Sequence, residues 1–296
     1  MAEGSITKYR AFITVCETGS FSKAAEMMAY SQSGISRMVK DLEAEWGISL
    51  LERGKTGVSL TPDGERLLPF VRDICRGSER LEGQVDMING LETGLVRIGT
   101  ITSVSQNVLP GILKAFLAAY PNIEFELILG EYDLVSEAVR TGRADMGFLN
   151  IPAGSGIDAE PLFTDEYKVV LPKGHPLADL DAVPLEMMKD YPFIELMKDG
   201  RNETPEVFGG KRPDLDTRFS TWDDYAIMAM VENGLGISIL PGLVLDHCPY
   251  DIITKSLAEP KMRTIGIATK SGESPSVAVE RFIGFVRAHA AQEGGV

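Results

Sequence analysis

The apolar positions between residues 31 and 46 recur at the spacing of an α-helix. They fall at i, i+3, i+4 and i+7, which puts one stripe on a buried face: Ile35, Met38, Val39 and Leu42. Hydrogen-bond donors take the same spacing on the opposite face: Ser33, Ser36, Arg37 and Lys40. Ser31 stands where its hydroxyl can cap the first turn. Such a helix suits the major groove of DNA, but an ordinary amphipathic surface helix has the same periodicity, so this segment alone leaves both interpretations open.

The flanking segments favour the DNA-binding interpretation. Upstream, an amphipathic pattern over residues 6–15 is followed by Gly19, which ends a helix, and by Ser22, which can cap a second short one. Downstream, a glycine-bounded turn over residues 54–57 is flanked by two short apolar runs, residues 50–53 and 58–60. Three helices and a hairpin make a winged helix-turn-helix, whose wing offers Arg53 and Lys55 to phosphates or to the minor groove.

The order of these residues resembles the LysR-type transcriptional regulators of bacteria. The resemblance rests on a long spaced pattern and continues over the rest of the chain: Phe21-Ser22-x-Ala24-Ala25, Ser31-Gln32-Ser33-x-Ile35-Ser36, Leu42-Glu43, Gly47, Leu51-x-Arg53 and Leu60-Thr61-x-x-Gly64. It implies that the second helix of the motif reads the major groove through four side chains: Gln32, Ser33, Ser36 and Arg37. Arg53 is then the wing residue. Gly34 stands where the family more often has alanine, and because glycine costs roughly 1 kcal/mol in a helix interior we expect a slightly frayed helix start.

The charge balance excludes a protein that holds DNA through bulk charge. The chain has 29 lysines and arginines against 43 aspartates and glutamates, a formal net charge of −14. Residues 1–90 are themselves slightly acidic. Since phosphate neutralisation supplies most non-specific affinity, two copies must share one site and gather their basic side chains on one surface: Arg37, Lys40, Arg53 and Lys55. We expect modest affinity of a single copy and a steep dependence on salt.

A long helix over residues 62–88 offers a means of pairing two copies. Thr61 can cap it, and Pro62 suits its first position. Its apolar residues step by four and three over three heptads, interrupted only at Ser78: Leu67, Val71, Ile74, Leu81, Val85 and Ile88. The helix could instead pack on its own domain, but little nearby sequence could bury so regular a stripe. We therefore predict a two-helix dimer interface. The resemblance implies the same, together with a homotetramer.

From residue 91 onward, short apolar runs alternate with helical patterns. The first set predicts strands and helices in turn: residues 96–99, 108–119, 123–129, 134–141 and 144–149. The second set follows from about residue 166: residues 169–171, 193–195, 223–233, 236–240, 264–269 and 277–288. This alternation predicts an α/β domain with a mainly parallel sheet. The predicted organisation is a DNA-binding domain over residues 1–61, a linker and dimerisation helix over 62–90, and an effector-binding domain over 91–296.

The resemblance divides this last domain into two lobes like those of periplasmic solute-binding proteins. It implies that lobe I covers about residues 91–163 and 268–296 and that lobe II covers about 164–267. The chain would then cross between them near Phe163–Val169 and Ile265–Thr269.

Ligands of open α/β sheets bind beyond the carboxyl ends of strands, where helix N-termini offer free amides. Two turns fit this rule, one with the hydroxyls of Thr100, Thr102 and Ser103 and one with Tyr132. The resemblance places an effector at both turns and a strand end of the other lobe opposite them, which adds Glu195 and Thr221. The hydroxyls suit an anion or a polar molecule, whereas the acidic neighbours leave a non-anionic effector open. Plain helix capping is an equally good explanation of Ser and Thr before a helix.

Other features indicate no cofactor and no metal. The sequence Gly234-Leu235-Gly236 lies between a helix and a strand, the wrong order for a dinucleotide turn, and predicts a helix C-cap. The histidines lack ligand partners at metal spacing: His175, His247 and His289. The chain has three cysteines without a pairing motif, Cys16, Cys75 and Cys248, and it shows no apolar signal segment. It also has no run of about 18 apolar residues. These features predict a cytoplasmic protein without a membrane span.

We therefore predict a non-enzymatic, sequence-specific regulator that binds double-stranded DNA as a homodimer or homotetramer. A small-molecule effector between the lobes would control its DNA contacts and its contact with RNA polymerase. The alternatives are an α/β enzyme, for which the sequence offers no nucleophile elbow, phosphate loop or metal cluster, and a small-molecule-binding protein without a DNA role.

Overall fold

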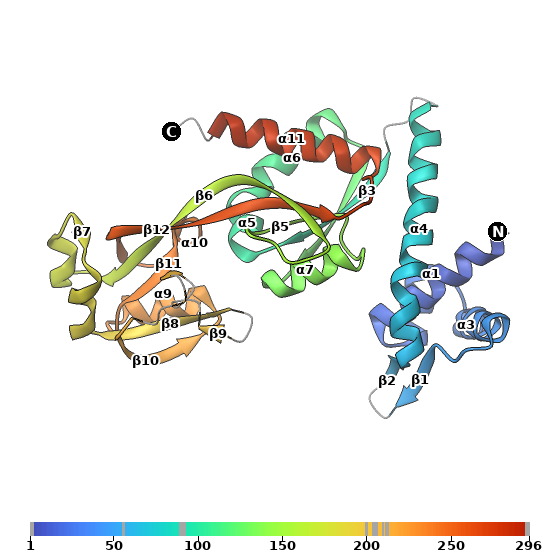
Figure 1. Ribbon diagram of the computed structural model, residues 1–296, viewed down its shortest axis with the longest axis horizontal. Helices are drawn as coiled ribbons and strands as arrows, with labels where there is room; N and C mark the ends of the chain where they lie inside the picture. Colours follow the sequence, from blue (N-terminus) through green and yellow to red (C-terminus); the bar gives the residue numbers. More distant parts are fainter. Residues whose placement is uncertain are drawn as a thin grey trace. The chain divides into compact units, whose positions relative to one another are not determined.

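The computed structural model describes residues 3–54, 57–88, 93–198, 201–202, 207–208, 210 and 213–293, apart from the side chains of residues 3–5, 53, 87, 198, 201–202 and 292–293. The chain divides into two compact units (Figure 1). Unit 1 holds residues 1–93 with the short segments 141–143 and 274–277. Unit 2 holds residues 94–140, 144–273 and 278–296. The predicted DNA-binding and linker segments fall in unit 1, and the effector domain falls mainly in unit 2.

Unit 1 forms the predicted helix-turn-helix and wing. Its elements follow in chain order: α1 (Glu3–Thr18), α2 (Phe21–Met28), α3 (Gln32–Trp46), β1 (Leu51–Gly54), β2 (Gly57–Leu60) and α4 (Pro62–Ile88). Gly19 follows α1 at φ +62°, a conformation that favours glycine. The prediction that Ser22 caps α2 is wrong. Ser20 is the cap, because its backbone is extended and its hydroxyl accepts from the Lys23 amide at 3.4 Å, whereas Ser22 lies inside the helix.

The second helix of the motif, α3, forms as predicted. The Ser31 hydroxyl accepts a hydrogen bond from the Gly34 amide at 3.1 Å, so the helix begins at a capped position. Its apolar stripe faces the core of unit 1, with Ile35, Val39 and Leu42 buried and Met38 partly buried. Fraying of the first turn at Gly34 stays a prediction.

The core of unit 1 extends into the first half of α4. Leu68, Val71 and Cys75 are buried in this core, and Leu67 and Ile74 are partly buried against it. The prediction that nearby sequence could not bury the stripe of α4 is therefore wrong for this half. A helix packed on its own domain has the same spacing of three and four as a coiled coil, so periodicity could not separate the two. Thr61 caps α4 as predicted, accepting from the Gly64 amide at 3.0 Å.

Lobe I of unit 2 follows the predicted alternation of strands and helices. Its elements are β3 (Gly94–Thr100), α5 (Thr102–Asn107), α6 (Leu109–Ala119), β4 (Ile123–Leu129), α7 (Tyr132–Arg140), β5 (Met146–Asn150) and α11 (Val277–Glu293). Strand β3 lies between β4 and β5 and is parallel to both. Figure 1 shows α6 and α11 on one side of these strands and α7 on the other. The rings of Phe116 on α6 and Phe282 on α11 meet edge to face, with centroids 5.1 Å apart.

Two long strands connect the lobes, β6 (Ile157–Pro172) and β12 (Ile252–Lys270), and they pair antiparallel along their lengths (Figure 1). The sheet order is β11-β6-β12-β5-β3-β4, so the mainly parallel prediction holds for β5-β3-β4 but not for the connecting strands. The second predicted crossing, at residues 265–269, is misplaced. Residues 265–268 already pair with β5 inside lobe I, so the chain crosses before Ile265.

Lobe II contains the remaining described elements. They are the 3₁₀ helices η1 (Pro176–Asp179) and η2 (Leu185–Asp190), the strands β7 (Ala182–Val183), β8 (Pro192–Lys198), β9 (Arg201–Asn202), β10 (Asp216–Thr221) and β11 (Ser238–Pro241), and the helices α9 (Asp224–Glu232) and α10 (Gly242–Leu245). Strands β8 and β10 are parallel. Asp223 caps α9, and Gly234 follows it at φ +72°, as the Gly-x-Gly segment predicts.

Candidate functional site

The outward face of α3 carries the predicted DNA-reading side chains. Four of them are exposed: Gln32, Ser33, Arg37 and Lys40. The fifth, Ser36, is half-buried. Among the described residues, Arg37 contacts Asp41 alone, at a long distance of 3.9 Å. Because the Arg37 side chain is 84% exposed, its guanidinium can exchange that contact for one with DNA.

The wing is attached to α3 by a carboxylate. Glu43 Oε1 accepts hydrogen bonds from the amides of Leu50 and Leu51 at 2.8 and 3.2 Å, which fixes the start of the hairpin. Arg53 lies in β1, where its side chain is not described, and Lys55 lies outside the described residues.

The second half of α4 differs from the first in its exposure. Leu81, Val85 and Ile88 are 66%, 47% and 82% exposed, so half of the predicted dimerisation stripe is available to a partner. Leu67, Val71 and Ile74 belong to the core of unit 1 instead.

The predicted effector turns lie at one small cavity of unit 2, here called the cleft. Its volume is only about 10 Å³, and both lobes line it: Ile101, Thr102, Ser103, Gly130, Glu131, Tyr132, Asp224, Pro241, Val244 and Arg263. Thr100 is fully buried and does not line it. Glu195 and Thr221 do not line it either. Glu195 is 2% exposed on β8, and the Thr221 hydroxyl accepts from the amide of Asp223, the residue that caps α9.

Arg263 on β12 occupies the centre of this site. It is 5% exposed, and its Nε donates to Asp165 Oδ2 on β6 at 2.8 Å. Its Nη1 donates to the Tyr132 hydroxyl at 2.9 Å and its Nη2 to the Ser103 hydroxyl at 3.0 Å. One guanidinium therefore joins both predicted effector turns to the connecting strands.

Neither Arg263 nor Asp165 was identified from the sequence. They are 98 positions apart and lie directly opposite each other in the antiparallel register of β6 and β12. Each stands in a run of charged and polar residues with no motif around it, so only the strand pairing reveals them.

Hydrogen bonds also join the two lobes beside the cleft. The Tyr225 hydroxyl donates to Gln106 Oε1 at 3.0 Å, and Asn107 Nδ2 donates to the Leu243 carbonyl at 2.7 Å. The Leu243 amide in turn donates to Asp165 Oδ1 at 2.9 Å. Asp165 thus bonds Arg263 through one oxygen and α10 through the other.

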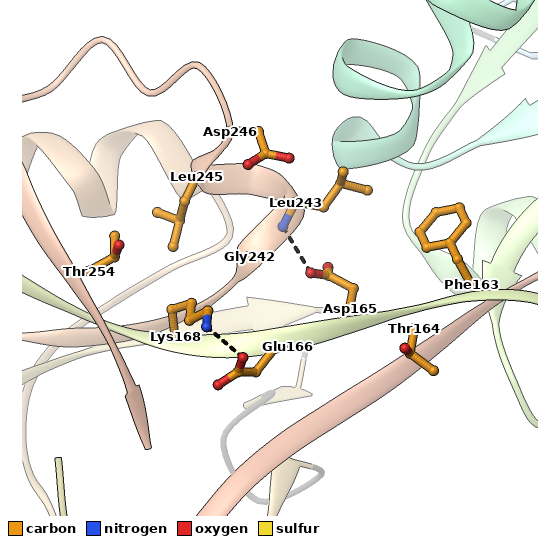
Figure 2. A pocket seen from close by; sticks show the side chains of 10 residues that line it. All are labelled: Phe163, Thr164, Asp165, Glu166, Lys168, Gly242, Leu243, Leu245, Asp246 and Thr254. Atoms are coloured by element: carbon orange, nitrogen blue, oxygen red, sulfur yellow. Dashed lines mark hydrogen bonds and ion pairs between the residues drawn. The ribbon is translucent and has the colours of Figure 1, made fainter. Parts of the chain in front are cut away.

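A second, larger cavity lies between β6, α10 and β12, and we call it the hinge cavity (Figure 2). It measures about 380 Å³ and is lined by Phe163, Thr164, Asp165, Glu166, Lys168, Gly242, Leu243, Leu245, Asp246 and Thr254. Lys168 donates to Glu166 at 2.5 Å and to Ser256 at 3.0 Å. Burial by itself raises the pKa of Glu166, but hydrogen bonds with Lys168 and Ser256 and the Lys168 charge together lower the pKa below its ordinary value.

Two further titratable side chains noted in the sequence, His175 and Cys16, have their pKa shifted by burial. His175 Nδ1 accepts from the Leu177 amide at 3.2 Å and so caps η1, and burial lowers the pKa of this imidazole. Burial raises the pKa of Cys16 to about 12, which keeps this thiol protonated.

Within the described ranges, no cluster of three or more histidine, cysteine or acidic side chains could hold a metal ion. Among the same residues, none of the helices combines the length and the apolar character needed to cross a membrane.

Two family models cover almost the whole chain. Residues 6–65 match the bacterial regulatory helix-turn-helix protein of the lysR family, and residues 89–291 match the LysR substrate binding domain. Among relatives, the chain is 31% identical over 285 residues to the probable HTH-type transcriptional regulator LrrA of Synechococcus elongatus, covering 96% of both chains.

Solved structures share the fold at full length. A full-length OxyR variant from Pseudomonas aeruginosa superposes with a TM-score of 0.77 at 24% identity, covering 98% of this chain and 94% of that one. Full-length CbnR complexed with its target DNA gives a TM-score of 0.67 at 22% identity, covering 97% and 99%. With a helix-turn-helix in unit 1 and a two-lobed substrate-binding domain in unit 2, the chain is a DNA-binding transcriptional regulator of the LysR family.

Proposed function

We propose that α3 and the wing bind the operator of this regulator in the cytoplasm. The observation that carries the assignment is the row of exposed donors opposite the buried stripe of α3. The proposed contacts to bases and phosphates are Gln32, Ser33, Ser36, Arg37, Lys40, Arg53 and Lys55. Because the chain is acidic overall, these few contacts and their duplication in a dimer must supply the affinity.

Arg37→Ala tests this assignment against Arg218→Ala, which removes the same charge from lobe II. Loss of one base contact costs about 1–3 kcal/mol, or roughly 5- to 150-fold in affinity. Fluorescence anisotropy on an operator fragment selected from genomic DNA by the wild-type protein measures the change. We expect weakening for Arg37→Ala alone. Equal affinity of the two variants would contradict the assignment.

The dimer interface that we propose is the exposed second half of α4. Leu81, Val85 and Ile88 form its apolar stripe. A homotetramer would need a further contact between effector domains. Glu at Leu81 or Val85 places a charge in this interface and should yield monomers in sedimentation velocity, whereas Gln84→Glu on an exposed neighbouring position should not. Dimers that persist in both stripe variants would refute the assignment.

For the effector, we propose the cleft between the lobes, at Thr102, Ser103 and Tyr132. Thr100, Glu195 and Thr221 do not line it, since Thr100 and Glu195 are buried and the Thr221 hydroxyl bonds the Asp223 amide. Because the cleft has almost no free volume, an effector must open the lobes or displace Arg263. An effector that prefers one lobe geometry shifts the population toward it, and we propose that this alters the spacing of the paired DNA-binding units and contact with RNA polymerase.

A thermal-shift screen of metabolites on the full-length chain tests the effector site, since a ligand stabilises the state that it binds. Ser103→Val should abolish the shift of a true effector. DNA footprints that are identical with and without that effector would count against the coupling.

A further inference from the structure

Arg72 on α4 carries the one charge that is buried among the described residues of unit 1. It is 7% exposed, and its Nη2 donates to Glu17 Oε1 on α1 at 3.2 Å. Its Nε is also buried and finds no acceptor within the described part of the chain. Burial lowers the pKa of Arg72 below its ordinary value, because the surrounding protein solvates the charge less well than water does.

The stability of unit 1 does not require a charge at this position. Apolar side chains of similar volume can replace a buried ion pair without loss of stability, and the core beside Arg72 is itself apolar, with Leu68, Val71 and Cys75 buried in it. Apolar contacts are not directional, whereas a charge-assisted hydrogen bond prefers one length and one angle. The pair therefore adds a directional contact between α1 and α4 to the apolar packing.

Glu17 lies in the last turn of α1, at the corner that leads to α2. The Gly19 carbonyl in this corner accepts from the Val58 amide of the wing at 3.0 Å, and Ser20 caps α2. The corner thus joins α1, α2 and the wing. Through Glu17, Arg72 attaches α4 to that corner.

A second ion pair joins the same two helices at another point. Arg10 on α1 and Glu82 on α4 approach to 3.7 Å. This contact lies about two to three helical turns from the Arg72–Glu17 contact on each helix. Two separated contacts define the direction of one helix against another, whereas one contact defines only a point. The second pair is exposed and hence the weaker of the two, so the buried pair carries most of this restraint.

The direction of α4 matters once two copies pair through its exposed half. It then decides how far apart the two heads lie, each head being α1 to α3 with the wing. We propose that Arg72 and Glu17 are positioning residues that fix the direction of α4 against its head and thereby select the spacing of the two half-sites on DNA. This inference rests on the dimer interface proposed above. The pair acts through α4 and needs no contact with DNA.

Arg72→Met combined with Glu17→Gln tests the proposal in the full-length protein. The double variant removes both charges and keeps the net charge, so its urea unfolding midpoint should equal that of the wild type. Fluorescence anisotropy compares the operator fragment selected by the wild type with the same fragment lengthened by two base pairs between its footprinted halves. This insertion moves the second half-site by about 7 Å and rotates it by about 70°.

The two proteins should differ in their response to the insertion. We expect the wild type to bind the lengthened operator at least about tenfold more weakly than the original, and the double variant to bind the two within about threefold. Arg72→Lys keeps a cation opposite Glu17 and should retain most of the wild-type discrimination. Arg218→Met combined with Asp216→Asn removes an exposed pair from lobe II and should discriminate as the wild type does.

Two results for the double variant would overturn the proposal. Discrimination equal to that of the wild type would show that apolar packing alone sets the direction of α4. A lower urea midpoint with equal weakening on both fragments would show a purely structural role. Sedimentation velocity on the wild type separates this inference from the dimer interface: a monomer refutes the interface on α4, whereas a dimer that binds both fragments equally refutes the selection of spacing.

Discussion

The cleft and the hinge cavity lie on the same pair of connecting strands and differ in what fills them. In the cleft, a buried guanidinium bonds Asp165, Tyr132 and Ser103, and almost no free volume remains. In the hinge cavity, the Lys168 ammonium donates to Glu166 and Ser256, and about 380 Å³ stays open. The difference teaches that the strand-end turns of this regulator are occupied by its own side chain, so ligand access there requires movement, whereas the neighbouring space is preformed.

Arg263→Met should have the largest effect on this comparison. It leaves the Asp165 carboxylate buried without its cation, and removal of one partner of a buried pair costs about 3–5 kcal/mol. Urea unfolding followed by circular dichroism measures the loss. Arg218→Met breaks an exposed pair with Asp216 and should change stability by less than about 1 kcal/mol.

A double variant distinguishes the lost pair from lost packing. Arg263→Met combined with Asp165→Leu removes both charges and should recover most of the stability. A double variant as unstable as Arg263→Met alone would show that packing around the guanidinium matters more than its charge.

Tyr132→Phe should have the next largest effect. It removes one acceptor of the buried guanidinium and leaves an N–H without it, at a cost of about 1–3 kcal/mol. Tyr225→Phe removes the exposed hydrogen bond to Gln106, which joins the lobes beside the cleft, and should cost less. Equal losses of stability for the two variants in thermal unfolding would mean that the hydrogen bond inside the cleft is no better shielded from water than the exposed one beside it.

Glu166→Gln should remove an acid-sensitive contribution from the hinge cavity. Because the pKa of Glu166 in the folded protein lies below its ordinary value of 4.5, its stabilisation is fully present above that value and is lost as the pH falls through the folded pKa. The wild type should therefore lose more stability than the variant in unfolding experiments below about pH 4.5. Parallel curves for the two proteins would contradict the assigned ion pair.

His175→Asn provides the smallest effect and a reference away from both cavities. Burial lowers the pKa of His175 below 6.5, so its contribution to stability is present above that value and declines as the pH falls toward the folded pKa. Asparagine can still cap η1 but does not titrate. Between about pH 7 and pH 5, the wild type should lose slightly more stability than the variant.

Local patterns carried the prediction of α3 and of the alternation in lobe I. Ser31 and the stripe from Ile35 to Leu42 are close in sequence, so capping and periodicity specify the helix. The same reasoning misassigned Leu67, Val71 and Ile74, because a helix packed on its own domain and a coiled coil share their spacing.

The features that the sequence did not predict depend on pairing between distant strands. The Arg263–Asp165 pair and the position of the second crossing both depend on the register between β6 and β12, which no local pattern encodes. The effector turns were predicted at Ser103 and Tyr132, but the residue that joins them comes from a distant strand.

The burial of Val71 and Cys75 also bears on where this protein can be cut. A fragment that stops at residue 61 would lack α4 and leave apolar side chains of α1 uncovered. The shortest DNA-binding fragment that keeps its core extends past Cys75, which makes the first four turns of α4 part of the folded head. Cleavage just before Leu81 would instead separate a folded head from the exposed stripe of α4, and so separate that head from the dimer interface proposed above.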